Sequence, residues 1–150
     1  MGNKIIALNK KAKHDYFLYD RFEAGIVLTG TEIKSIRLGK VQFKDAYISI
    51  INREAFIKEM NIALYKEGNI NNHDETRVRK LLLNNAEIVK LRQKLTQQGY
   101  TIVPCAIYLK NGRAKVEIAL AKGKALYDKR QSEKEQTAKR EIEKAIKNKY

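Results

Sequence analysis

The sequence predicts a mainly β fold with embedded helices (α+β), consisting of a small closed β-barrel followed by a C-terminal tail. Three observations support this class. Runs of β-branched and aromatic residues recur along the chain up to Leu120. The dipeptide Asn111-Gly112, between two apolar runs, is typical of a two-residue β-hairpin turn. After Gly123 the chain has no glycine, no proline and few residues that could enter a core. We therefore expect the barrel to end there.

Length and charge limit the classes of function. A chain of 150 residues suits one domain with an appendage. It carries 31 Lys and Arg against 17 Asp and Glu, a net charge of +14, which is typical of proteins that bind nucleic acid or an anionic membrane. No apolar run approaches the ~20 residues of a membrane span, and the N-terminus lacks the pattern of a signal peptide. We expect no membrane partner and a cytoplasmic location, with Cys105 as a buried, inert thiol.

The N-terminal quarter predicts a basic arm and two short strands. Residues 1–13 contain four lysines and no acid, and we expect a mobile arm that pairs late. The runs 16–19 and 22–28 have strand composition, with a turn expected at Asp20-Arg21. Thr31 would then cap a short helix over 32–38, and Gly39 would end it.

The middle of the chain predicts a hairpin, a loop and a long helix. The alternating runs 47–51 and 55–62 form a hairpin joined at residues 52–54, and a polar loop covers 66–75. From Thr76 the apolar residues recur at spacings of three and four, which predicts a helix that ends before Gly99. These residues are Leu81, Leu82, Leu83, Ile88, Leu91 and Leu95.

The C-terminal half of the barrel predicts a second hairpin. Residues 100–109 form an apolar strand, and Asn111-Gly112 turns the chain into a partner strand over 113–120. Pro104 cannot donate a backbone hydrogen bond, so we expect an edge position or a bulge there. Several short strands with two helices between them are typical of an oligonucleotide-binding-like barrel. We place the basic arm at 1–13, the barrel at 14–124 and the tail at 125–150.

The tail has the composition of a segment that folds only on a partner. From Ala121 to Tyr150 the chain carries ten basic and five acidic residues. Ala138, Ile142 and Ile146 form a thin apolar stripe, too narrow to hold an isolated helix. We expect the tail to be disordered when free and helical when bound. A helix over 132–150 would reach about 28 Å.

The chain shows no catalytic constellation. Its only histidines, His14 and His73, stand outside the spacings of zinc ligands. Four acidic residues lie close together in the sequence: Asp15, Asp20, Glu23 and Glu32. Two of them could form a catalytic acid/base pair, but in so basic a chain we expect them to balance the charge of adjacent Lys and Arg residues. We expect no enzyme activity, metal, cofactor or small-molecule substrate.

Basic and aromatic residues are interleaved as nucleic-acid binding requires. Arg77, Arg79 and Lys80 form a basic cluster at the expected helix start, where positive charge opposes the helix dipole. Tyrosines and a phenylalanine near Lys115, Lys122 and Lys124 could stack on bases. For Tyr16, Tyr19 and Tyr108, packing in the barrel is the alternative. Tyr127, at the exit from the barrel, is a candidate for stacking.

The order of several motifs resembles the SsrA-binding protein family, also called small protein B, the partner of transfer-messenger RNA in bacteria. The matching motifs are residues 9–17 (NKKAKHDYF), 22–26 (FEAGI), 30–37 (GTEIKSIR), 79–84 (RKLLLN), 99–101 (GYT), 115–116 (KV), 123–124 (GK) and 128–130 (DKR). One motif alone would be weak, whereas all of them in sequence are specific. The resemblance implies an oligonucleotide-binding-type barrel with a disordered tail.

The resemblance also implies a function in ribosome rescue. The family binds the tRNA-like domain of transfer-messenger RNA, and its tail enters the empty messenger channel beyond the decoding centre of the small ribosomal subunit. Positions that hold transfer-messenger RNA correspond to Glu23, Leu82, Asn84 and Lys115. The ribosome-engaging segment corresponds to Lys122, Lys124, Tyr127, Asp128, Lys129 and Arg130.

Alternatives remain at single residues and for the whole chain. Glu23 could instead pair with Arg37 or Lys115, and Leu82 could lie in the core. The leading hypothesis is an RNA-binding adaptor that couples transfer-messenger RNA to stalled ribosomes in trans-translation. A protein that binds ribosomal RNA alone is the second hypothesis. A nuclease that uses Glu23 and Asp20 with a metal is the third.

Overall fold

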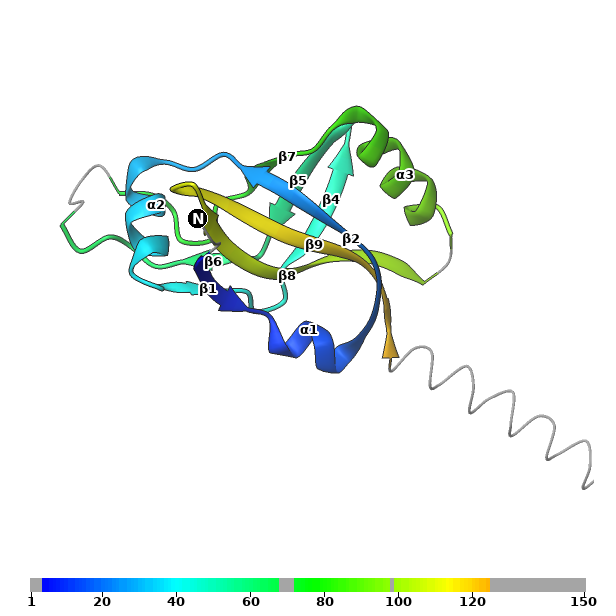
Figure 1. Ribbon diagram of the computed structural model, residues 1–150, viewed down its shortest axis with the longest axis horizontal. Helices are drawn as coiled ribbons and strands as arrows, with labels where there is room; N and C mark the ends of the chain where they lie inside the picture. The colour runs from blue at the N-terminus through cyan, green and yellow to red at the C-terminus, as the bar shows by residue number, and fades with distance from the viewer. Residues whose placement is uncertain (1–3, 68–71, 98, 125–150) are drawn as a thin grey trace, which may run out of the picture.

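The computed structural model describes residues 4–67, 72–97 and 99–124, in which three long strands run side by side through the middle of the molecule (Figure 1). The helices are α1 (Lys10–Asp15), α2 (Gly30–Arg37) and α3 (Asn85–Leu95). The strands are β1 (Lys4–Leu8), β2 (Tyr16–Ile26), β3 (Val41–Gln42), β4 (Tyr47–Ile51), β5 (Glu54–Lys58), β6 (Asn61–Ile62), β7 (Arg79–Leu82), β8 (Tyr100–Lys110) and β9 (Arg113–Gly123). No helix of this described part is long and apolar enough to cross a membrane.

Seven strands form one antiparallel sheet in the order β1-β8-β9-β2-β7-β5-β4, and β3 pairs with β6 separately. The mainly β class with a few helices is therefore confirmed. The closed barrel is not confirmed, because no ladder among the described residues joins β1 to β4 at the two ends of the sheet. The sheet is nevertheless strongly curved, since β4 packs against β8.

The inner face of the curved sheet carries the core. Ile57, Ile107, Val116 and Ile118 come from three strands and are fully buried, and Ile36 of α2 joins them. Alternate residues of these strands point to opposite faces, so their neighbours in sequence point outward. A second, smaller cluster lies beneath α1.

Both hairpin turns and the proline bulge agree with the sequence expectations, but the strand expected over 55–62 ends at Lys58, and Asn61–Ile62 pair with β3 instead. Asn52 and Arg53 both have positive φ between β4 and β5, as do Asn111 and Gly112 between β8 and β9. Positive φ at both central residues is the geometry of a type I′ turn, which matches the twist of the flanking strands. The register of β8 against β9 shifts at Pro104, which confirms the bulge, although β8 is not an edge strand.

Four other expectations were wrong or displaced. No turn divides 16–28, because β2 runs through Asp20-Arg21 with a bulge between Leu18 and Arg21. The residues expected to form a mobile arm contribute β1, which pairs with β8 through an apolar run, and the start of α1. Thr29, rather than Thr31, caps α2. The helix expected from Thr76 begins only at Asn85, and the preceding leucines belong to β7 or follow it.

Candidate nucleic-acid interface

One lateral row of residues crosses the outer face of the sheet. Tyr108 on β8 is opposite Lys115 on β9, Lys115 is opposite Gly25 on β2, and Gly25 is opposite Leu82 on β7. Residues paired directly across strands point to the same face. We call Glu23, Gly25, Leu82, Lys110 and Lys115 the outer-face patch. It brings together three of the four residues expected to hold transfer-messenger RNA, from three separate strands.

Glu23 is exposed and its carboxylate is held from two sides. The Lys110 ammonium lies 3.4 Å from one carboxylate oxygen. A hydrogen bond from the Tyr108 hydroxyl lowers the pKa of Glu23, and the nearby charges of Lys110 and Lys115 lower it further. Glu23 therefore forms its salt bridge with Lys110, and not with Arg37 or Lys115, the two partners considered from the sequence. The carboxylate is an ionised acceptor beside two cations, which suits donors on a base or a ribose.

Leu82 and Asn84 lie where β7 leads into α3. The Leu82 side chain is 53% exposed, so the alternative of a core leucine was wrong. Asn84 caps α3, since its side-chain oxygen accepts from the backbone N–H of Glu87 at 2.9 Å. The Glu87 carboxylate accepts in return from the backbone N–H of Asn84, which completes a capping box. The cap holds Asn84 in place with its side-chain amino group still available as a donor.

The positive charge of the patch continues along the β8–β9 turn. A surface depression there is lined by Glu23, Lys110, Asn111, Arg113 and Lys115. Three cations around one carboxylate leave a net positive surface that a phosphate backbone would complement.

A second basic surface lies where β9 ends. The Nζ atom of Lys122 is 4.4 Å from the ring centre of Tyr100, and that of Lys94 is 5.8 Å from it. The Tyr19 ring meets the Tyr100 ring edge to face, with centroids 5.8 Å apart. Next to this group, the Nζ atom of Lys124 lies 5.4 Å from the ring centre of Phe17. We call these six residues the aromatic–lysine cluster.

The patch and the cluster lie on opposite faces of β9. Lys115 is at an odd position of the strand and Lys122 at an even one, and successive strand residues alternate between faces; Lys124 directly follows the strand. Among the residues expected to engage the ribosome, Lys122 and Lys124 lie in this cluster. Tyr127, Asp128, Lys129 and Arg130 lie outside the described residues.

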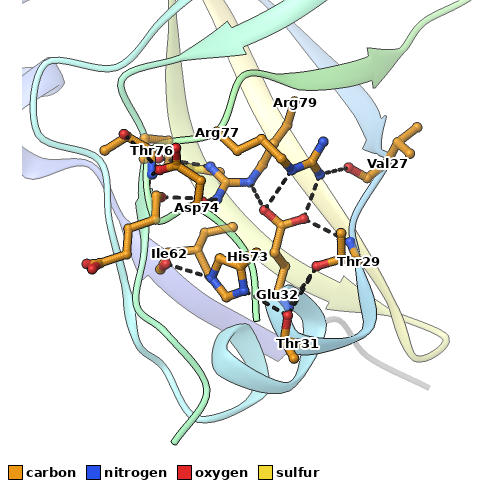
Figure 2. Close-up of polar contacts among 12 residues, drawn as sticks. Val27, Thr29, Thr31, Glu32, Ile62, His73, Asp74, Thr76, Arg77 and Arg79 are labelled. Carbon is orange, nitrogen blue, oxygen red and sulfur yellow. Dashed lines mark hydrogen bonds and ion pairs between the residues drawn. The ribbon is translucent and has the colours of Figure 1, made fainter. Parts of the chain in front are cut away.

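Within the basic cluster expected at Arg77, Arg79 and Lys80, the two arginines belong to a structural network, whereas Lys80 lies at the surface and pairs with Glu54. Arg79 is completely buried, and its guanidinium pairs with the equally buried carboxylate of Glu32 (Figure 2). Arg77 donates to the same carboxylate at 2.6 Å. Burial disfavours the Glu32 carboxylate, but hydrogen bonds from Arg77, the backbone N–H of Thr29 and Arg79 outweigh it and lower its pKa.

His73 belongs to the same network. Its Nε2–H donates to the carbonyl oxygen of Ile62 at 2.9 Å, and its Nδ1 lies 2.8 Å from the Thr31 hydroxyl (Figure 2). Asp20 pairs with Lys90, at 3.4 Å. In the described part of the chain no three His, Cys, Asp or Glu residues gather in a way that could hold a metal ion. Glu23 and Glu32 each face cations here, as expected for acids in so basic a chain.

Burial bears on two of the aromatic expectations, those for Tyr19 and Tyr108, and on the expectation for the thiol. Tyr108 packs among its neighbours and is 8% exposed, whereas Tyr19 is 44% exposed beside Tyr100. Cys105 is buried, and burial raises the pKa of its thiol to about 11, so it is inert as expected. Sequence reasoning missed Gly25, Lys110 and Tyr100. Strand alternation within β2 would place Gly25 beside Glu23, but no local pattern links it to Leu82.

Comparison with known proteins gives consistent matches. A family model described as SmpB protein matches residues 6–148. An SsrA-binding protein of Clostridium kluyveri is 56% identical over 149 residues, covering 99% of this chain and 95% of the relative. An SsrA-binding protein of Clostridium tetani is 54% identical and covers 98% of this chain and 94% of the relative.

A solved structure agrees with these matches. It is described as "tmRNA-SmpB: a journey to the center of the bacterial ribosome" and superimposes with a TM-score of 0.68 at 43% sequence identity. The superposition covers 79% of this chain and 83% of the other.

Proposed function

The chain belongs to the SmpB family, and on this premise we propose that it is an RNA-binding adaptor for trans-translation. It binds the tRNA-like domain of transfer-messenger RNA and delivers that RNA to stalled ribosomes. The observation that carries this proposal is the outer-face patch, in which an exposed leucine, a fixed carboxylate and two lysines face the same side of the sheet. Donors, acceptors and an apolar contact together suit folded RNA with unpaired bases.

Each residue of this RNA-binding surface has a distinct role. Lys115 contacts a phosphate, and Glu23 accepts from a base or ribose donor while Tyr108 and Lys110 hold its position. Leu82 packs on an unpaired base. Asn84 donates from its amide while its oxygen caps α3. None of these roles includes a bond-making step, so the protein acts as an adaptor and not as an enzyme.

The aromatic–lysine cluster and the tail form the ribosome-binding part. The cluster lies on the opposite face of β9 from the outer-face patch and near its C-terminal end, so both RNA partners can be bound at once. Residues 125–150, with Tyr127, Asp128, Lys129 and Arg130 at their start, follow from there. This segment enters the messenger channel beyond the decoding centre and becomes helical there. Such a role places the protein in the cytoplasm.

A competition experiment tests the proposal. Labelled transfer-messenger RNA is bound to the full chain in a mobility-shift assay and challenged with either unlabelled transfer-messenger RNA or fragments of ribosomal RNA. We expect the first competitor to displace the label at much lower concentration. Equal competition would contradict the proposal and favour a protein that binds ribosomal RNA alone. RNA cleaved in the presence of Mg²⁺ would instead favour the nuclease.

A further inference from the structure

Gly25 lies at the centre of the outer-face patch. Lys115 on β9 is its partner on one side, and Leu82 on β7 is its partner on the other. Glu23, two residues earlier on β2, points to the same face. Every neighbour of Gly25 in this row carries a functional side chain, so the glycine leaves a gap in the middle of the patch.

The backbone does not require a glycine at this position. Gly25 has no left-handed φ, unlike Gly39 and Gly112, and the register shift of β2 falls between Leu18 and Arg21, away from Gly25. Glycine in the interior of a strand weakens the strand because it adds chain entropy and has no side chain to pack. Another requirement must therefore explain it.

The requirement is space for Leu82. A Cβ atom added at Gly25 would lie 3.2 Å from the Cβ atom of Leu82, 3.4 Å from its Cδ1 and 3.7 Å from its Cγ. Directly opposed Cβ atoms in antiparallel strands are usually about 4.5–5.5 Å apart. The leucine side chain therefore lies across the backbone of Gly25, and its outer surface is still 53% exposed.

We propose that Gly25 is a positioning residue for RNA binding, because the missing side chain lets Leu82 lie flat as an apolar platform beside Lys115. The platform takes the face or edge of an unpaired base, while Lys115 reaches the adjacent phosphate. This inference rests on the proposed function, since it assigns how one part of the RNA-binding surface is shaped. A side chain at Gly25 would tilt Leu82 away from the row and fill part of the platform.

The test compares Gly25→Ala with the matched control Gly30→Ala. A Cβ atom at Gly30 would have no neighbour within 4 Å, so this control adds the same methyl group without a contact. We expect Gly25→Ala to bind transfer-messenger RNA about five- to tenfold more weakly, the loss expected when an apolar contact to one base is impaired. Its midpoint of urea unfolding should change little: rotation of the exposed Leu82 side chain relieves the contacts to Cγ and Cδ1, and the lower chain entropy of alanine offsets the small strand shift that the 3.2 Å Cβ–Cβ contact requires. Gly30→Ala should bind RNA as the unaltered chain does.

A double-mutant cycle separates this inference from the proposed function. In a Leu82→Ala background, Gly25→Ala should cause little further loss of RNA affinity, because the platform is already gone. If Leu82→Ala weakens binding and Gly25→Ala does not, the inference about Gly25 is overturned and the proposed function stands. If Leu82→Ala has no effect, Leu82 makes no RNA contact and the inference also fails, whereas the competition experiment still decides the function.

A second variant tests the same claim without changing Gly25. Leu82→Ile keeps the size of the side chain but moves its branch to Cβ, so that it cannot lie across Gly25 in the same way. We expect weaker RNA binding with an unchanged unfolding midpoint. Unaltered binding by Leu82→Ile would overturn the proposal even if Gly25→Ala did not fold.

Discussion

Single residues of the outer-face patch differ in what their surroundings allow them to do. Glu23 is kept ionised by a hydrogen bond from Tyr108 and by two lysines, so it can only accept hydrogen bonds. Lys115, half-buried between Gly25 and Tyr108 in the row, can reach outward only through its ammonium group. The charges of Glu23 and Lys115 therefore have fixed positions, which a charged residue elsewhere on the surface would not reproduce.

At this scale we predict that Lys115→Ala weakens binding to transfer-messenger RNA and lowers its salt dependence. Each lysine that neutralises a phosphate releases about one counterion, so the slope of log affinity against log salt should fall by about one. The measurement is a salt titration by mobility shift. Lys40→Ala is the control, because this exposed lysine lies between α2 and β3, outside both basic surfaces. An unchanged slope for Lys115→Ala would show that Lys115 contacts no phosphate.

At the scale of elements, buried charge holds α2 against β7. Thr29 and Glu32 form a capping box at the start of α2, and the same Glu32 carboxylate binds Arg77 and Arg79. Arg79 in turn donates to the carbonyl oxygen of Met60 at 2.9 Å. One carboxylate therefore completes a helix cap and neutralises a buried guanidinium.

We predict that Glu32→Gln lowers the free energy of unfolding at pH 7 by about 3–5 kcal/mol, because it leaves Arg79 buried without a counter-charge. The pKa of Glu32 is lowered in the folded chain, so its ionisation stabilises the fold above the unfolded pKa of about 4.3. This contribution disappears as the pH falls through the lower folded value. Urea unfolding at pH 7 and below pH 4 should show the two proteins converging in acid.

The control for that prediction is an ion pair at the surface, between Glu54 on β5 and Lys80, the residue after Arg79 on β7. The Lys80 ammonium lies 3.2 Å from the Glu54 carboxylate, and the two side chains are 43% and 49% exposed. Glu54→Gln should therefore change the free energy of unfolding by less than about 1 kcal/mol. If Glu32→Gln also lowered the free energy of unfolding by less than about 1 kcal/mol, the buried network of Glu32 and Arg79 would contribute little to stability.

For the whole molecule, we infer that RNA binding and ribosome binding use different parts of the chain. The outer-face patch and the aromatic–lysine cluster lie on opposite faces of β9, and the tail begins next to the cluster. The basic net charge of +14 serves both parts. Loss of one part should therefore leave the other intact.

We predict that deletion of residues 132–150 leaves the affinity for transfer-messenger RNA nearly unchanged but abolishes tagging on stalled ribosomes. This segment has few apolar residues, so its removal should hardly change the stability of the folded part that the structure describes, residues 4–67, 72–97 and 99–124. Affinity is measured by mobility shift, and tagging in a translation reaction on a messenger without a stop codon. Normal tagging by the shortened chain would contradict the assignment of the tail to the messenger channel.

The sequence by itself determined the features that depend on local pattern. The hairpin connections at 52–54 and at Asn111-Gly112, the bulge at Pro104, the buried Cys105 and the end of α2 before Gly39 were all predicted from neighbouring residues. Turn geometry and strand alternation are set within a few residues, so a single sequence carries them.

Only the tertiary structure decided which distant residues meet. Glu32 and Arg79, which form the buried ion pair, are 47 positions apart in the sequence. The leucines after Thr76 have the spacing of a helix, yet residues 79–82 form a strand because they pair with β5 and β2. The same ladder places Leu82 over Gly25 and turns Asn84 into a cap. Strand pairing overrides local periodicity because backbone hydrogen bonds and core burial are satisfied only between segments that are far apart in the chain.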